Sequence, residues 1–123
     1  MNLKSLDHYT VCVSDLDVSV RFYEDILNLK SGPRPNFGFP GAWLYIDDAP
    51  VVHLIADRES NTSETGPFDH IAFRGTGVEG TIKRLEENRI GFRRNEIEDI
   101  GMTQLFIHDP DSVMVELNFM DKA

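Results

Sequence analysis

The sequence predicts an α+β fold made of two βαβββ modules. The segment Leu6-Asp7-His8-Tyr9-Thr10-Val11 is echoed by Phe68-Asp69-His70-Ile71-Ala72-Phe73, a shift of 70 − 8 = 62 positions. Residues 51–55 are echoed by residues 114–118, with His53 matched to Glu116 at a shift of 116 − 53 = 63. A repeat of this length indicates two copies of one structural unit. Each copy also joins one segment of helical periodicity to several segments of strand-like alternation, which indicates mixed α+β modules.

The first module is expected over residues 4–57 and opens with a strand. Over residues 5–13 the side chains alternate, with Tyr9, Val11 and Val13 on the more hydrophobic face. Ser14-Asp15 then supplies a helix cap, because short polar side chains accept hydrogen bonds from the first free N–H groups of a helix. The residues expected to face inward from this helix are Val18, Phe22, Ile26 and Leu29.

The rest of the first module is predicted to contain three strands, of which the first is the least defined. Asn28 can end the helix in a left-handed conformation. The Gly- and Pro-containing segment 31–35 resists regular structure. Strands near 42–47 and 50–56 follow, joined by a tight turn at Asp47-Asp48.

The second module, residues 68–120, is expected to repeat this order after a polar linker at 58–67. A strand at 68–74 precedes a helix at 78–89, whose inward residues are Val78, Ile82 and Leu85. The predicted strands that follow are 92–98, 101–108 and 113–119, the last two joined by a turn at 109–112. Residues 1–123 together are of the size of a single domain.

The amino-acid composition argues against several classes of function. A net charge of −9 argues against nucleic-acid binding, which depends on clustered basic residues. No apolar run reaches the ~18 residues typical of a membrane span, and the sequence before the first strand is too short for a signal peptide. A single cysteine, Cys12, excludes an internal disulfide and favours a cytoplasmic protein.

Four residues at repeat-equivalent positions are candidate metal ligands: His8, His53, His70 and Glu116. Strand alternation puts them on faces opposite the hydrophobic faces that pack under the helices. Neutral imidazole and carboxylate suit a divalent metal ion such as Fe, Mn, Ni, Co or Zn. The alternative is that each is an ordinary strand residue satisfied by a hydrogen bond. Three of the four histidines fall at these positions, which favours the metal site.

Residues on the same faces are candidates for a substrate pocket. Trp43 and Phe106 are repeat-equivalent, Thr10 shares the face of His8, and Gln104 shares the face of Phe106. The plain alternative is that they belong to the core. Phe37–Trp43 places aromatic residues on a Gly- and Pro-containing loop, which favours a pocket lid or dimer contact equally with simple loop packing.

The chain resembles the vicinal oxygen chelate superfamily of glyoxalases, bleomycin-resistance proteins, fosfomycin-resistance transferases and extradiol dioxygenases. The resemblance covers almost the whole chain and rests on the strand with His8, residues 20–27, residues 68–73 and residues 106–117. It implies an open, cup-like mixed sheet with helices outside, often in a homodimer. It also implies a divalent metal held at the positions of His8, His70 and Glu116, with His53 at the fourth position.

The resemblance implies a metal-dependent glyoxalase- or dioxygenase-like enzyme, a lyase or an oxidoreductase, whose small substrate chelates the metal through vicinal oxygens. Glu116 would be the catalytic base of an isomerase or lyase reaction. Two departures separate the chain from particular subfamilies: His53 where glyoxalase I typically has glutamate, and Phe106 where two other subfamilies usually have tyrosine. The alternative is a metal-free ligand- or drug-sequestering protein of the bleomycin-resistance type, which the acidic composition and the Phe37–Trp43 segment favour.

Overall fold

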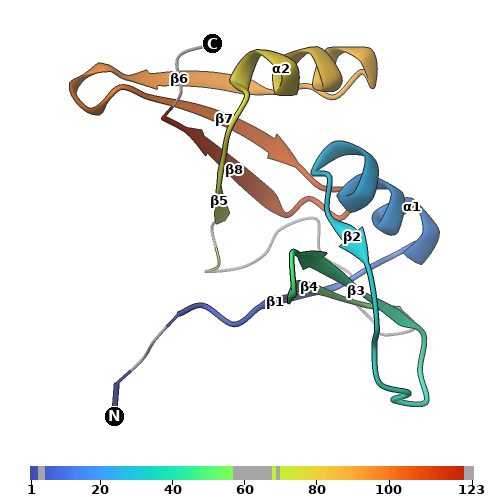
Figure 1. Cartoon of the computed structure of the whole chain (residues 1–123). Helices are drawn as coiled ribbons and strands as arrows, with labels where there is room; N and C mark the ends of the chain where they lie inside the picture. The colour runs from blue at the N-terminus through green and yellow to red at the C-terminus, as the bar shows by residue number, and fades with distance from the viewer. Residues whose placement is uncertain (3–4, 57–67, 69, 121–123) are drawn as a thin grey trace. The chain divides into compact units, whose positions relative to one another are not determined.

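The computed structural model describes residues 1–2, 5–56, 68 and 70–120 (Figure 1). The chain divides into two compact units, Met1–Asn61 and Thr62–Ala123. The predicted linker at 58–67 lies outside the described residues. Within the described part of the chain, no helix is long and apolar enough to cross a membrane.

The first unit contains one helical segment and one four-stranded mixed sheet. Its elements are β1 (Tyr9–Cys12), α1 (Leu16–Arg21), the π-helical turn η1 (Phe22–Ile26), β2 (Lys30–Ser31), β3 (Gly41–Ile46) and β4 (Ala49–Ile55). The strand order is β1-β4-β3-β2. Strand β1 runs parallel to β4, whereas the β4–β3 and β3–β2 pairs are antiparallel. The poorly defined second strand is real but only two residues long.

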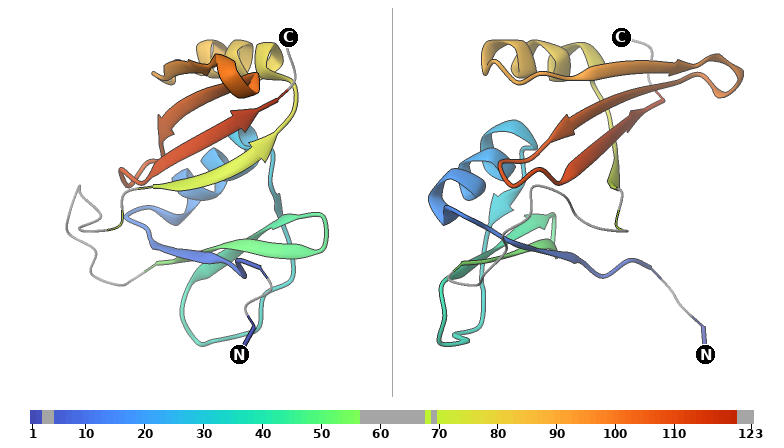
Figure 2. Two further views of the ribbon diagram at one scale, coloured as in Figure 1. Left: turned by 90° about the vertical axis from the view of Figure 1, so that its left-hand side faces the viewer. Right: turned by 180° about the vertical axis from the view of Figure 1, so that it is seen from behind.

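The second unit repeats this plan. Its elements are β5 (Ile71–Gly75), α2 (Val78–Glu87), β6 (Arg93–Ile97), the short 3₁₀ helix η2 (Glu98–Ile100), β7 (Met102–His108) and β8 (Met114–Phe119). The order β5-β8-β7-β6 matches that of the first sheet, with β5 parallel to β8. Figure 2 shows α2 running along β6, to which an ion pair between Arg94 and Glu79 connects it. The predicted α+β class with two βαβββ modules is confirmed.

The first helix starts where the sequence predicts, and three of the four residues expected to face inward are buried. The Asp15 side chain caps it by accepting from the Val18 N–H at 3.2 Å. Val18, expected inside, is 40% exposed, and Ser19 is buried instead. The reason is the change to π-helical hydrogen bonding at η1, where the Leu27 N–H donates to the Phe22 carbonyl, five residues back. The wider turn shifts the phase of the helix, so that Phe22 and Ile26 are still buried.

Strand alternation separates a buried face from a half-exposed face in both sheets. The fully buried strand residues in the first sheet are Leu44, Val52 and Leu54, and in the second they are Leu105, Ile107 and Val115. Their sequence neighbours on β4, β7 and β8 lie on the opposite, partly exposed faces. His53 and Glu116 belong to these half-exposed faces. A side chain there is positioned by a rigid ladder while remaining accessible to a ligand.

Candidate functional site

The first unit brings His53 between two other rings. Thr10 on β1 and Trp43 on β3 are the cross-strand partners of His53 on β4. The His53 ring centroid lies 3.7 Å from that of His8 and 4.1 Å from that of Trp43, with interplanar angles of 11° in both cases. The His53 imidazole is therefore sandwiched between His8 and Trp43 in a three-ring stack.

One ring nitrogen of each histidine in this stack faces an oxygen acceptor. His8 Nδ1 lies 2.6 Å from a carboxylate oxygen of Asp7, and His53 Nε2 lies 3.0 Å from the Pro50 carbonyl. Since these oxygens accept hydrogen bonds, His8 Nδ1 and His53 Nε2 carry the protons of these bonds, and the lone pair of a neutral His53 ring lies on Nδ1. Burial lowers the pKa of His53 and the neighbouring His8 lowers it further, so His53 is neutral near pH 7.

The second unit brings His70 and Glu116 together. Glu116 on β8 has Ala72 of β5 and Phe106 of β7 as its cross-strand partners, the same arrangement that surrounds His53 in the first unit. His70 precedes β5 by one residue, and its Nε2 lies 3.4 Å from Glu116 Oε1. The Glu116 side chain is only 13% exposed and that of His70 is 40% exposed. The carboxylate is thus largely shielded, with one oxygen turned toward an imidazole.

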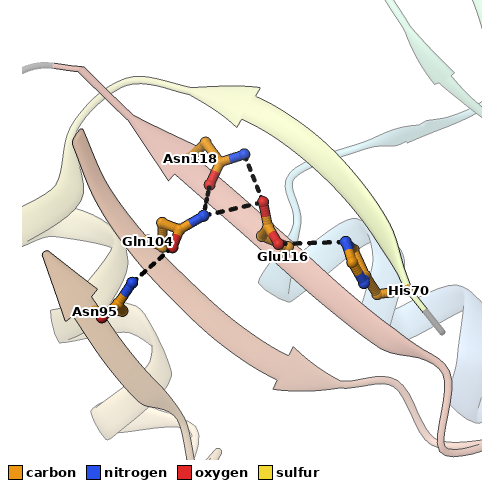
Figure 3. Close-up of polar contacts among 5 residues, drawn as sticks. All are labelled: His70, Asn95, Gln104, Glu116 and Asn118. Carbon is orange, nitrogen blue, oxygen red and sulfur yellow. Dashed lines mark hydrogen bonds and ion pairs between the residues drawn. The ribbon is translucent and has the colours of Figure 1, made fainter. Parts of the chain in front are cut away.

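A chain of amide side chains holds the other oxygen of Glu116 (Figure 3). Glu116 Oε2 accepts from Asn118 Nδ2 at 2.8 Å and from Gln104 Nε2 at 3.2 Å. Gln104 Nε2 also lies 3.2 Å from Asn118 Oδ1, and its Oε1 accepts from Asn95 Nδ2 at 2.8 Å. The network crosses β6, β7 and β8. It fixes the rotation of the carboxylate, so that Oε1 remains directed at His70.

Phe106 lies directly opposite Glu116 in the β7–β8 ladder. The guanidinium of Arg93, its partner on β6, lies 4.1 Å from the centre of the Phe106 ring. This distance is that of a cation–π contact. A tyrosine at this position would add a hydroxyl beside Glu116, so the departure noted in the sequence falls next to the carboxylate itself.

The predicted site residues therefore form two groups, one in each unit. His8, His53, Thr10 and Trp43 gather in the first, and His70, Glu116, Gln104 and Phe106 in the second. Among the described residues, no three His, Cys, Asp or Glu side chains come together as a metal site requires.

Sequence reasoning missed three supporting residues. Asn118 shares a strand face with Glu116, so the period of two was the signal that pointed to it. Asn95 is bonded to Gln104, and Asp7 is bonded to His8. Neither contact follows from the spacing of the residues along the chain.

The donors fit a divalent first-row metal ion in their chemistry. Imidazole nitrogen and carboxylate oxygen are ligands of such ions, and a ligating histidine usually donates its second N–H to a carboxylate or carbonyl oxygen, as His8 does to Asp7. His53 fits less well in its stacked position. Lone pairs lie in the ring plane, and two parallel rings 3.7 Å apart do not direct them at one ion. His53 as a fourth ligand stays a prediction.

Comparisons with known proteins agree with the fold. Glyoxylase I 4 of Arabidopsis thaliana is 33% identical over 125 residues, which cover 95% of this chain and 71% of the relative. Metallothiol transferase FosB of Staphylococcus saprophyticus is 27% identical over 123 residues, covering 94% and 77% of the two chains. The crystal structure of a glyoxylase/bleomycin resistance protein/dioxygenase domain from Frankia has a TM-score of 0.80 at 21% identity, covering 99% and 96%.

The family assignment rests on a match over almost the whole sequence. The sequence profile of the Glyoxalase/Bleomycin resistance protein/Dioxygenase superfamily matches residues 5–117, a span that contains all four candidate ligands. The chain belongs to the Glyoxalase/Bleomycin resistance protein/Dioxygenase superfamily.

Proposed function

We propose that this protein is a metal-dependent enzyme of the glyoxalase or dioxygenase type. Its ligands would be His8, His70 and Glu116, with His53 as the predicted fourth. The substrate would be a small molecule that chelates the metal through vicinal oxygens. The names of two relatives, glyoxylase I and metallothiol transferase, support a metalloenzyme within this superfamily.

The observation that carries the proposal is the asymmetric environment of Glu116. Its Oε2 is occupied by two amide donors, whereas its Oε1 faces His70 Nε2 at 3.4 Å. The amide donors hold one oxygen in place, which leaves the other oxygen directed at an imidazole. A ligand or a base needs this arrangement, because its reactive oxygen must be held in a fixed direction.

The chemistry follows from these roles. A bound divalent ion would act as a Lewis acid that stabilises negative charge developing on the substrate oxygens. Glu116 Oε1 would accept the proton from the substrate carbon in an isomerase or lyase reaction. Gln104 and Asn118 would keep Oε2 in place during that transfer. Thr10, Trp43, Gln104 and Phe106 would line the space that the substrate enters.

Metal analysis of protein purified without an affinity tag tests this proposal. The wild type should hold close to one divalent ion per site, and His70→Ala and Glu116→Gln should lose it. Glu86→Gln, which alters an exposed carboxylate on α2, is the matched control and should retain the metal. Substoichiometric metal that neither variant changes would exclude the enzyme proposal.

The identity of the bound metal and of the substrate that is turned over distinguishes a dioxygenase from a glyoxalase. Iron together with oxygen uptake would identify a dioxygenase, an oxidoreductase. Nickel or zinc together with turnover of the methylglyoxal–glutathione adduct would identify a glyoxalase, a lyase. We also propose a cytoplasmic homodimer, which light scattering of the purified protein and localisation in its host cell would test.

A metal-free binding protein is the second candidate function. The specific observation in its favour is the three-ring stack, because it engages His8 and His53 with each other and with Trp43. Such a protein would sequester its ligand without converting it. Binding of ligand that is unchanged by a chelator, with no metal in the purified protein, would identify this function.

A further inference from the structure

A pocket in the first unit contains a guanidinium that the proposed chemistry does not use. The pocket has a volume of about 160 Å³. Its lining includes Thr10, Arg34, Phe37, Phe39, Trp43 and His53. Arg34 lies on the loop between β2 and β3, in the segment where the sequence shows no periodicity.

The fold holds Arg34 in place at this pocket. Its Nη2 donates to the Phe39 carbonyl at 3.2 Å, and its guanidinium lies 5.0 Å and 5.2 Å from the ring centres of Phe37 and Phe39. A side chain at Gly41 would be excluded, because a Cβ there would fall 2.7 Å from Arg34 Nη2 and 2.5 Å from the Leu54 carbonyl oxygen. Gly41 therefore leaves the space that the guanidinium occupies.

The charge of Arg34 has no carboxylate partner among the described residues. This is notable in a chain with a net charge of −9, where acidic residues outnumber basic ones. A guanidinium has five N–H donors, and one of those of Arg34 is used by Phe39. The remaining donors are available to an anion that enters the pocket.

The walls of the pocket suit a flat ring. Phe37 and Phe39 stack with centroids 5.8 Å apart, and Phe37 lies 6.1 Å from Trp43. A cavity of ~150 Å³ in another protein takes up one benzene molecule. The volume here is thus that of one aromatic ring, and aromatic walls favour ring stacking.

We propose that this pocket binds a small aromatic carboxylate. The carboxylate would pair with Arg34, whose planar fork matches it in a bidentate manner, and the ring would lie among Phe37, Phe39 and Trp43. The Thr10 hydroxyl would donate a further hydrogen bond. That the bound carboxylate is the substrate rests on the proposed function, whereas the binding itself does not.

Trp43 gives a direct readout, because it is the only tryptophan in the chain and lines this pocket. Benzoate is titrated into the chelator-treated full chain while Trp43 fluorescence is recorded. Benzyl alcohol, which keeps the ring without the charge, and acetate, which keeps the charge without the ring, are the comparison probes. Benzoate should change the fluorescence saturably, and the other two should bind at least ~10-fold more weakly.

Variants assign the binding to Arg34. Arg34→Gln should weaken benzoate binding by ~10-fold or more, and Arg34→Lys should weaken it less. Arg21→Gln, which removes an exposed charge from α1 in the same unit, should bind benzoate like the wild type. Circular dichroism checks that each variant is folded. If Arg34→Lys is folded and neither Arg34→Gln nor Arg34→Lys changes the affinity for benzoate, the proposal is wrong.

The outcome is independent of the metal. Saturable, Arg34-dependent benzoate binding would support the pocket, and it would stand even if the protein as purified held no metal and the enzyme proposal failed. A stoichiometric metal with no benzoate response in the wild type would refute the pocket alone. Equal affinities for benzoate and benzyl alcohol would also refute it, because the guanidinium would then contribute nothing.

Discussion

Removing the amide of Asn118 should weaken metal binding without removing any ligand. Asn118→Ala deletes the 2.8 Å donor to Glu116 Oε2. The Glu116 side chain is 13% exposed, so water replaces that donor only in part. The loss of a hydrogen bond to a charged group costs about 1.5–3 kcal/mol. Loss of a partner behind a metal ligand lowers affinity by ~10- to 100-fold, roughly 1.4–2.7 kcal/mol, which is the same range.

The network predicts an order among three variants. Gln104→Ala removes the longer, 3.2 Å contact to Glu116 and also frees Asn118, so its loss of affinity should approach that of Asn118→Ala. Asn95→Ala touches only Gln104 and should have the smallest effect. The double variant of Gln104 and Asn118 should lose less than the sum of the two single losses, because the residues share one network.

Competition with a chromophoric chelator measures these affinities, and thermal unfolding shows whether each variant remains folded. Asn88→Ala is the matched control, since Asn88 Nδ2 makes an equally short 2.8 Å bond to the Arg84 carbonyl at the end of α2, away from Glu116. The reasoning fails if Asn118→Ala binds metal like the wild type while Glu116→Gln does not. It also fails if Asn88→Ala loses as much affinity as Asn118→Ala.

Three further predictions concern the core, the response to pH and the support of His8. Leu105→Ala, at a fully buried position, should lower the free energy of unfolding by about 2–5 kcal/mol in urea titrations. The hydrogen bond from Arg94 lowers the pKa of Glu96, so this pair stabilises the fold at neutral pH. Its contribution to the free energy of unfolding disappears as the pH falls through the lowered pKa. NMR titration of Arg94→Gln should show that the Glu96 pKa rises. Asp7→Asn should weaken metal binding ~10-fold or more in the same chelator assay, because the carboxylate that orients His8 is lost.

The repeat made most of the fold predictable. Strand alternation is a local property, and it identified the buried faces of β4, β7 and β8 because one face of each sheet is covered. It placed His53 and Glu116 on the opposite faces for the same reason. The exposure of Val18 on the first helix was not predictable, since the π-helical turn at Phe22–Ile26 changes the number of residues per turn without any sequence signal.

The site was predictable at the level of single residues but not of their contacts. The three-ring stack around His53 depends on the lateral pairing of β3, β4 and β1, which pattern analysis of one strand does not contain. Arg34 could not be found for a different reason. It lies on a loop without periodicity, and its position depends on the space that Gly41 leaves.

The parallel pairing within each unit has a consequence for folding. Hairpins β3–β4 and β7–β8 join strands close in sequence, whereas β1 pairs with β4 and β5 with β8 across most of a module. Closing a long loop costs more entropy than closing a short one, so we expect the hairpins to form first and β1 and β5 to dock last. His8 and His70 immediately precede these two strands. Local unfolding that releases β1 or β5 would therefore free a histidine while leaving Glu116 held in its hairpin, which gives a candidate ligand a route to exchange without global unfolding.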